Sequence, residues 1–139
     1  MSTRILIVDD SSAVRNALRT CLQLTPGFEV CGEAGNCYAA IDLVRELAPD
    51  IVLLDYSMPG INGIEAAQQI SAIRPQTKML LFTMHGSEHL YRMAERIGIR
   101  AVVAKGVGGI QEIVRLISAL HRELDKTSPP GTFDNNPNQ

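Results

Sequence analysis

The sequence predicts an α/β fold in which a parallel sheet is covered by helices on both faces. Five short apolar runs alternate with five segments whose apolar residues recur at helical spacing. Apart from Glu29 in the second, the runs are continuously apolar, as expected of strands that are buried on both faces. Each connection is long enough to hold the crossover helix that parallel neighbours require. The pattern therefore favours a single sheet with a helix between each pair of successive strands.

The predicted strands are short, and each fits a buried strand in length. The second carries no acidic or basic group at its end, and we place it at an edge of the sheet. The five runs cover residues 5–8, 28–31, 51–54, 79–82 and 101–104.

The first two helices are predicted from their apolar stripes. Residues 14–22 carry apolar side chains at i, i+3, i+4, i+7 and i+8, and either of the two preceding serines can cap this helix. Residues 40–47 carry the second stripe, with Asn36 as the expected N-cap. Pro49 ends this helix because the residue before a proline is disfavoured in helical conformation.

The remaining helices have equally clear ends. The third is expected after Gly63 and runs to about residue 74, where Pro75 stops it. Residues 90–97 form the fourth stripe, and Gly98 is the expected left-handed residue at its C-terminal end. Residues 110–120 form the fifth stripe.

Length and composition indicate one folded domain and a polar tail. A chain of 139 residues can bury a core without disulfides, and we assign residues 1–126 to that domain. Residues 127–139 are polar and rich in proline, so we expect a flexible tail. The same segment is equally compatible with the start of a linker to an output domain.

Charge and hydropathy exclude several classes of protein. The net charge of −2 lacks the basic character of nucleic-acid binders, so direct nucleic-acid binding is disfavoured. No apolar stretch approaches the roughly 20 residues that span a membrane, and no signal peptide is visible. Three cysteines without metal-type spacing indicate reduced structural thiols. We expect a soluble cytoplasmic protein.

Reactive side chains gather at the ends of the predicted strands. Asp9 and Asp10 follow the first strand, Asp55 the third, Thr83 the fourth and Lys105 the fifth. The carboxyl ends of parallel strands lie along one edge, so these groups can meet in one crevice. Singly, each residue has an ordinary interpretation as a strand end, turn former or solvated charge. Their coincidence at four strand ends favours a functional site.

These residues resemble the receiver domain of two-component response regulators. The resemblance extends over about residues 4–125 and includes Met58, Pro59 and Gly63 after the aspartate at 55. It implies a flavodoxin-like doubly wound sheet in strand order 2-1-3-4-5. It also implies a signalling module that catalyses only its own phosphoryl transfer and dephosphorylation.

The resemblance implies a role for each site residue. Asp55 accepts a phosphoryl group from a sensor histidine kinase or a histidine phosphotransfer protein. Mg²⁺ is bound by Asp10, Asp55 and the backbone carbonyl of Ser57, while Asp9 acts mainly through water. Lys105 contacts the incoming phosphoryl oxygens, and Thr83 then binds another of them.

The resemblance also implies an output. Phosphorylation is expected to change the face made by the fourth helix, fifth strand and fifth helix, to which a downstream protein target or a second copy in a phosphorylation-dependent dimer binds. Val102 stands where many receivers carry Tyr or Phe, so the aromatic part of the switch is in question while Thr83 remains. We expect a stand-alone receiver or one separated from a DNA-binding output domain. Ser57 and His85 occupy positions that shape access of water to the phosphoryl group.

Two other functions and one other metal site compete with the receiver. An aspartyl-phosphate phosphatase would use Asp9 as its nucleophile, but the second spaced aspartate expected of that class is missing. A flavodoxin-like cofactor binder needs a hydroxyl-rich phosphate loop, whereas Asp9 and Asp10 would repel a flavin phosphate. His85 and His89 have a spacing that can bind zinc, but no third ligand lies nearby in the sequence.

The clustered carboxylates lead to a thermodynamic expectation. Three neighbouring aspartates should repel one another and raise at least one pKa. Magnesium should then stabilise the fold.

Overall fold

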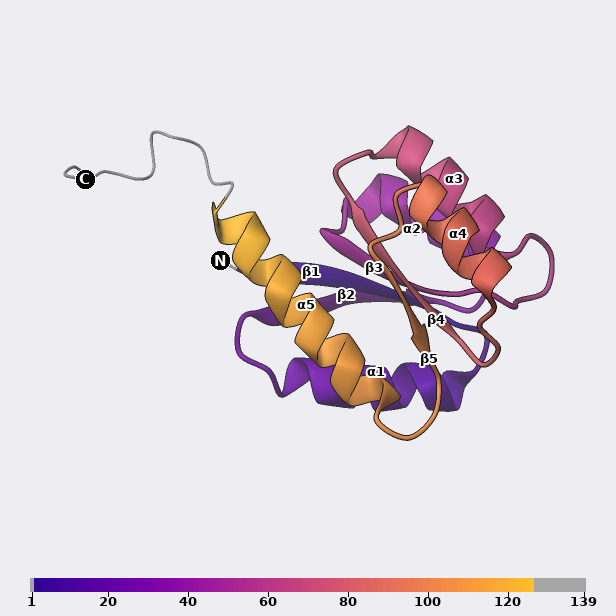
Figure 1. The fold of residues 1–139 in the computed structure, drawn as a ribbon. Helices are drawn as coiled ribbons and strands as arrows, with labels where there is room; N and C mark the ends of the chain where they lie inside the picture. Colours follow the sequence, from indigo (N-terminus) through magenta and orange to yellow (C-terminus); the bar gives the residue numbers. More distant parts are fainter. Residues whose placement is uncertain (1, 127–139) are drawn as a thin grey trace.

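The computed structural model describes residues 2–126, so the tail predicted at 127–139 lies outside the described residues. Strands and helices alternate along the described chain as predicted (Figure 1). Their bounds are β1 (Thr3–Val8), α1 (Ser12–Gln23), β2 (Phe28–Ala34), α2 (Cys37–Leu47), β3 (Ile51–Asp55), α3 (Gly63–Ile73), β4 (Lys78–Thr83), α4 (Glu88–Arg96), β5 (Ala101–Ala104) and α5 (Gly109–Lys126).

The five strands form one parallel sheet in the order β2-β1-β3-β4-β5. The predicted strand order and the edge position of β2 are confirmed. The three inner strands are apolar along almost their whole length, since both of their faces are covered by helices.

Helices cover the sheet in two layers, with α1 and α5 on one face and α2, α3 and α4 on the other (Figure 1). The alternation of side chains along β1 divides the core accordingly. Ile5 and Ile7 pack with α1 and α5, whereas Leu6 and Val8 pack with the other three helices. Among residues 2–126, no helix combines the length and apolarity needed to cross a membrane.

Strand β2 is longer than predicted and contains a bulge. It continues to Ala34, because its edge position leaves its residues only partly buried, so polar side chains such as Glu33 can be accommodated. Its register against β1 passes from Ile5↔Val30 to Leu6↔Gly32, so Cys31 is an extra residue on this strand. The sequence predicted an end at residue 31, which is wrong, because apolar character stops there while strand pairing does not.

The helix ends follow the local sequence signals. Ser11 is the N-cap of α1, and Asn36 is the N-cap of α2. Gly98 has φ +89° directly after the last turn of α4, as predicted for a left-handed C-terminal position. At the end of α2, however, Ala48 adopts φ 47°, a conformation that the sequence did not announce. Pro49 follows it and prevents the helix from continuing.

Candidate functional site

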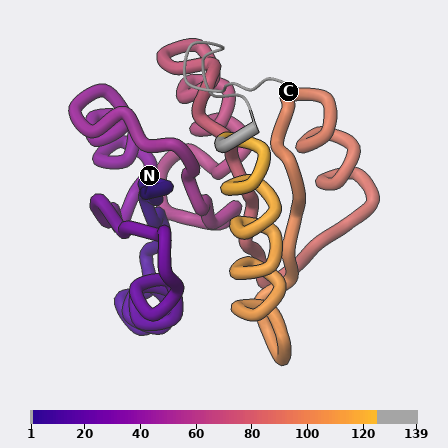
Figure 2. Tube along the Cα trace, turned by 90° about the vertical axis from the view of Figure 1, so that its left-hand side faces the viewer, coloured from indigo at the N-terminus to yellow at the C-terminus, as the bar shows by residue number. Residues whose placement is uncertain are grey.

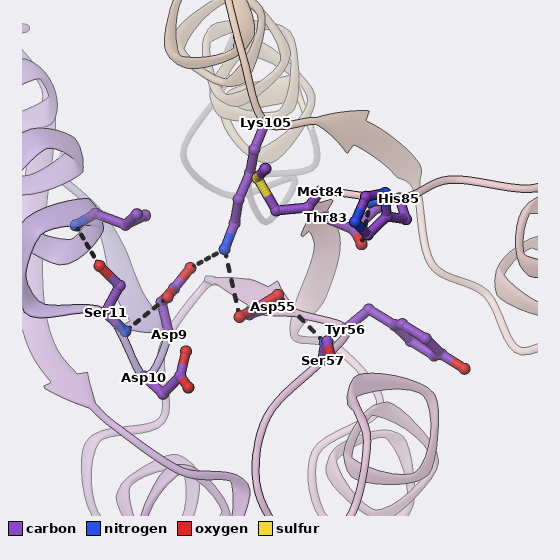
Figure 3. A pocket seen from close by; sticks show the side chains of 11 residues that line it. Asp9, Asp10, Ser11, Asp55, Tyr56, Ser57, Thr83, Met84, His85 and Lys105 are labelled. Atoms are coloured by element: carbon purple, nitrogen blue, oxygen red, sulfur yellow. Dashed lines mark hydrogen bonds and ion pairs between the residues drawn. The ribbon is translucent and has the colours of Figure 1, made fainter.

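An open cleft lies at the carboxyl ends of four strands (Figure 3). Its volume is about 490 Å³. It brings together the residues that the sequence predicted at the strand ends, although they come from distant parts of the chain. The lining residues are Asp9, Asp10, Ser11, Val14, Asp55, Tyr56, Ser57, Thr83, Met84, His85 and Lys105.

Asp55 is the last residue of β3 and is only 4% exposed. The backbone N–H of Ser57 donates a hydrogen bond of 3.3 Å to its Oδ1 atom. The chain then turns back, and the N–H of Gly63 donates to the carbonyl of Tyr56 at 2.8 Å. This turn holds the carboxylate of Asp55 at the floor of the cleft.

The turn requires glycine at position 63. A Cβ atom at this residue would lie 2.6 Å from the carbonyl oxygen of Asp55 and 2.8 Å from the Cα of Tyr56. Both neighbours are backbone atoms, which cannot rotate away. Asn62 and Glu65 close the start of α3 with a reciprocal capping box. The close packing of the start of α3 against the end of β3 thus fixes the position of Asp55.

Lys105 joins two carboxylates of the cleft. Its Nζ atom lies 2.6 Å from Oδ2 of Asp9 and 3.3 Å from Oδ2 of Asp55 (Figure 3). The residue follows β5 directly, at the start of the connection to α5. Figure 2 shows this connection as the orange loop that leads into α5. Its backbone N–H donates to the carbonyl of Thr83 at 2.8 Å, which continues the pairing of β5 with β4.

Three carboxylates form a candidate cation site. One oxygen from each of Asp9, Asp10 and Asp55 lies within 4.8 Å of the others. Asp9 is 2% exposed and accepts a hydrogen bond of 2.9 Å from the N–H of Ser11, whereas Asp10 is exposed. Mg²⁺ prefers oxygen ligands and keeps several waters, and this partly open set of carboxylates fits that preference. Among residues 2–126 this is the one such group of three acidic, His or Cys residues, and it includes neither His85 nor His89, whose spacing alone could bind zinc.

The pKa of Asp55 is raised above its ordinary value of 3.8. Burial is the largest cause and the charge of Asp9 is the next, while Lys105 acts in the opposite direction. The sequence predicted that carboxylate repulsion would raise a pKa in this group. Repulsion does contribute, but removal of the carboxylate from water contributes more, which the sequence could not reveal.

Thr83 also lies at the cleft, whereas Val102 lies elsewhere. Thr83 is 2% exposed, and its Oγ1 accepts a hydrogen bond of 3.3 Å from the N–H of His85. Val102 lines a separate hollow of about 330 Å³ on the α4 side of β5, together with Tyr91 and Ile99. Any influence of position 102 on the cleft must therefore pass through the chain between them.

Sequence reasoning did not identify Met84 as a cleft residue. It is 64% exposed and forms part of the rim. Its position directly after Thr83, past the end of β4, was the available signal. The β4–α4 connection starts there, and such connections supply the walls of a cleft in parallel sheets.

Comparisons with known proteins agree with this geometry. The family model for the response regulator receiver domain matches residues 5–118. The chemotaxis protein CheY of Thermotoga maritima is 36% identical, over 76% of this chain and 87% of its own. The response regulator UvrY of Escherichia coli K12 is 34% identical over 84% of this chain, and GacA of Pseudomonas aeruginosa is 32% identical over 82%. The match covers 53% of UvrY and of GacA, so this chain spans about half the length of those relatives.

Solved structures agree in fold as well as in sequence. A LuxR-family response regulator from Aurantimonas sp. SI85-9A1 has a TM-score of 0.82 and 34% identity, over 88% of this chain and 87% of the other. The receiver domain of the NarL regulator from Mycobacterium tuberculosis has a TM-score of 0.80 and 28% identity, over 87% and 97%. The family match, the sheet order and the relatives agree with one another, and the chain belongs to the receiver domain family of two-component response regulators.

Proposed function

We propose that this receiver accepts a phosphoryl group on Asp55, in a Mg²⁺-dependent reaction, from the phosphohistidine of a sensor histidine kinase or a histidine phosphotransfer protein. One observation carries the proposal. The carboxylate of Asp55 lies 3.3 Å from the ammonium of Lys105, in a cleft that also gathers Asp9 and Asp10. A buried carboxylate with a neighbouring cation and an acidic cation site is suited to in-line attack on phosphorus.

The reaction exchanges one bond to phosphorus for another. A carboxylate oxygen of Asp55 attacks the phosphorus, the P–N bond to the donor imidazole breaks, and the electron pair stays on the departing nitrogen. Lys105 is placed to attract the phosphoryl oxygens as charge shifts, because it already spans Asp9 and Asp55. Thr83 supplies a hydroxyl for another phosphoryl oxygen from the end of the neighbouring strand.

The acidic residues would hold the divalent cation. Asp10 and Asp55 would be its direct ligands together with the carbonyl of Ser57, and Asp9 would act through water. Bound Mg²⁺ supplies positive charge that offsets the repulsion between a carboxylate and an anionic phosphoryl group. Ionised Asp55 is the nucleophile, so any cation that opposes the rise in its pKa also favours the reactive form.

The signal leaves the cleft through Thr83 and the loop that follows it. The N–H of His85 donates to the hydroxyl of Thr83, and Gly86 lies against the ring of Tyr91 on α4. Redirecting this hydroxyl toward a phosphoryl oxygen biases the loop and the face made by α4, β5 and α5. A downstream protein target reads that face in the cytoplasm, with Val102 in place of a switching ring.

Intact mass spectrometry after incubation with acetyl phosphate tests the function. The wild type should gain one phosphoryl group in the presence of Mg²⁺ and none in excess chelator, and Asp55→Asn should gain none. Asp42→Asn, which changes an exposed aspartate of α2, is the matched control and should behave as the wild type. Equal labelling of the wild type and Asp55→Asn would overturn the assignment, as would turnover of acetyl phosphate without any adduct.

A further inference from the structure

Arg15 joins the backbone of Asp9 to the side chain of Glu33, and the proposed phosphoryl transfer does not use this bridge. This residue lies in the first half of α1, and its Nη1 atom donates to the backbone carbonyl of Asp9 at 2.6 Å. Its Nε atom donates to Oε1 of Glu33 on β2 at 3.0 Å. Arg19, one turn further along α1, donates to the other oxygen of Glu33. The bridge thus ties the turn after β1 to the edge strand.

The bulge in β2 is what brings Glu33 to this position. Before the bulge, Phe28 and Val30 face α1 and α5; after it, Ala34 packs on the opposite face of the sheet. If the strand were regular, with Cys31 paired in the ladder, the alternation would direct Glu33 away from α1. The bulge therefore serves to place a carboxylate where two arginines of α1 can bind it.

The Asp10 side chain depends on its backbone for direction. It is exposed, and within residues 2–126 none of the hydrogen bonds and ion pairs involves its carboxylate. Asp9, in contrast, is held by Ser11 and by Lys105. The carbonyl of Asp9 and the N–H of Asp10 belong to one rigid planar peptide unit. Arg15 holds the oxygen of that unit, and in the preceding peptide unit the N–H of Asp9 donates to the carbonyl of Ala34 at 3.0 Å.

We propose that Arg15, anchored by Glu33, is a positioning residue for the divalent cation. It fixes the peptide between Asp9 and Asp10 and so aims the Asp10 carboxylate at the site. This inference rests on the proposed function, since it deepens the role assigned to Asp10. A positioning role predicts that loss of Arg15 weakens cation binding. Charge alone predicts the opposite, because removing a positive charge beside an acidic cluster should strengthen cation binding. The direction of the effect therefore separates positioning from electrostatics.

The test is titration of the metal-free protein with Mg²⁺ and, separately, with Ca²⁺, followed by amide NMR. Arg15→Gln should raise the Mg²⁺ dissociation constant about tenfold, the lower end of the effects measured for residues that orient metal ligands. Ca²⁺ affinity should fall less, because Ca²⁺ tolerates irregular geometry and Mg²⁺ demands a near-ideal octahedron. Arg15→Lys keeps a donor for the Asp9 carbonyl, so its Mg²⁺ affinity should lie between those of the wild type and Arg15→Gln.

Arg19→Gln is the matched control, since Arg19 shares Glu33 but forms no hydrogen bond or ion pair with Asp9 in the described part of the chain. It should leave both affinities at the wild-type values. Arg15→Gln that binds Mg²⁺ as well as Arg19→Gln, or more tightly, would overturn the positioning role; so would equal losses for Mg²⁺ and Ca²⁺. The amide spectrum reports folding in the same experiment, and if Arg15→Gln does not fold, Arg15→Lys decides by the same comparison. A wild type that binds no Mg²⁺ would instead refute the proposed function.

Discussion

The ammonium of Lys105 keeps two buried carboxylates close together. Asp9 and Asp55 are almost completely buried, and each gains its nearest positive charge from this one side chain, which comes from the far end of the sequence. Removal of one partner from a buried ionic group costs more than the pair contributes, because it leaves uncompensated charge. The cleft is therefore more stable while cations occupy it, whether from Lys105 or from solution.

Replacement of Lys105 by methionine should destabilise the metal-free protein. We expect a loss of about 2–3 kcal/mol, smaller than for a fully enclosed pair because the cleft is open to water. Urea unfolding in chelator measures it, and Mg²⁺ should recover part of the loss by neutralising the same carboxylates. Lys78→Met is the control, since Lys78 forms no ion pair within residues 2–126. Equal stability of the two variants would show that the contacts of Lys105 contribute nothing.

The raised pKa of Asp55 predicts that ionisation of this residue lowers the free energy of unfolding as pH rises. A carboxyl whose folded pKa lies above its unfolded value is favourable to folding below the unfolded value, and this advantage is lost as pH rises through the folded pKa. Asp55→Asn cannot ionise and avoids that loss. In chelator, its stability relative to the wild type should therefore grow as pH rises from 3.8, the ordinary aspartate pKa, and level off above the folded pKa. Urea unfolding over a pH series checks this, and a difference that does not vary with pH would contradict it.

At the scale of single elements, the connections after the strands decide where the reactive groups lie. The turn from β3 to α3 needs Gly63, and the loop from β5 to α5 needs Gly109, where a Cβ would lie 2.7 Å from the carbonyl of Ala104. Both glycines allow a helix to begin close against the strand that it follows. The strands supply rigidity, and these close approaches set the depth of Asp55 and Lys105 in the cleft.

Gly63→Ala should therefore lower the free energy of unfolding by about 1–3 kcal/mol, the usual range for overpacking. The new methyl group meets backbone atoms of Asp55 and Tyr56, so the turn must shift. Gly35→Ala is the control, because its nearest contact is the end of the Arg15 side chain at 3.5 Å, an ordinary distance. Thermal unfolding of both variants provides the comparison. A loss no larger at Gly63 than at Gly35 would mean that the turn adjusts freely.

Much of this arrangement could be predicted from sequence, because the strands are continuous apolar runs that end at polar residues. The order of those ends then implied one crevice, and the family resemblance supplied the strand order. The bulge at Cys31 could not be predicted, since an extra residue in an edge strand leaves no mark in an already irregular apolar pattern. The hydrogen bond between Arg15 and Glu33 could not be predicted either, because the bulge decides which face of β2 the glutamate occupies. Ala48 likewise gave no signal for a left-handed conformation.

At the scale of the whole molecule, the fold brings three mutually repelling aspartates together at one edge of the sheet. Two hydrophobic layers bury the inner strands from both sides and leave the acidic cluster at their carboxyl ends. The stability gained in the core holds these carboxylates together against their mutual repulsion. Any ligand that binds the folded cleft and not the unfolded chain then stabilises the whole domain.

Magnesium should raise the free energy of unfolding by about 2.7 kcal/mol at a concentration one hundred times its dissociation constant. Chemical denaturation of the wild type with and without Mg²⁺ measures this gain. Asp10→Asn should show a much smaller gain, because it removes an exposed side chain that we propose as a ligand and does not disturb the core. An unfolding curve that Mg²⁺ leaves unchanged in the wild type would exclude a cation site in the cleft.

The most direct measurement is to locate the phosphoryl group on the chain. Borohydride reduction of the phosphorylated protein converts an aspartyl phosphate to homoserine, and peptide mass spectrometry then identifies the modified residue. Incubation with acetyl phosphate should yield homoserine at position 55 when Mg²⁺ is present, and no conversion in chelator. Conversion at Asp9 or Asp10, or conversion at Asp55 that is independent of Mg²⁺, would contradict the proposed chemistry of the cleft.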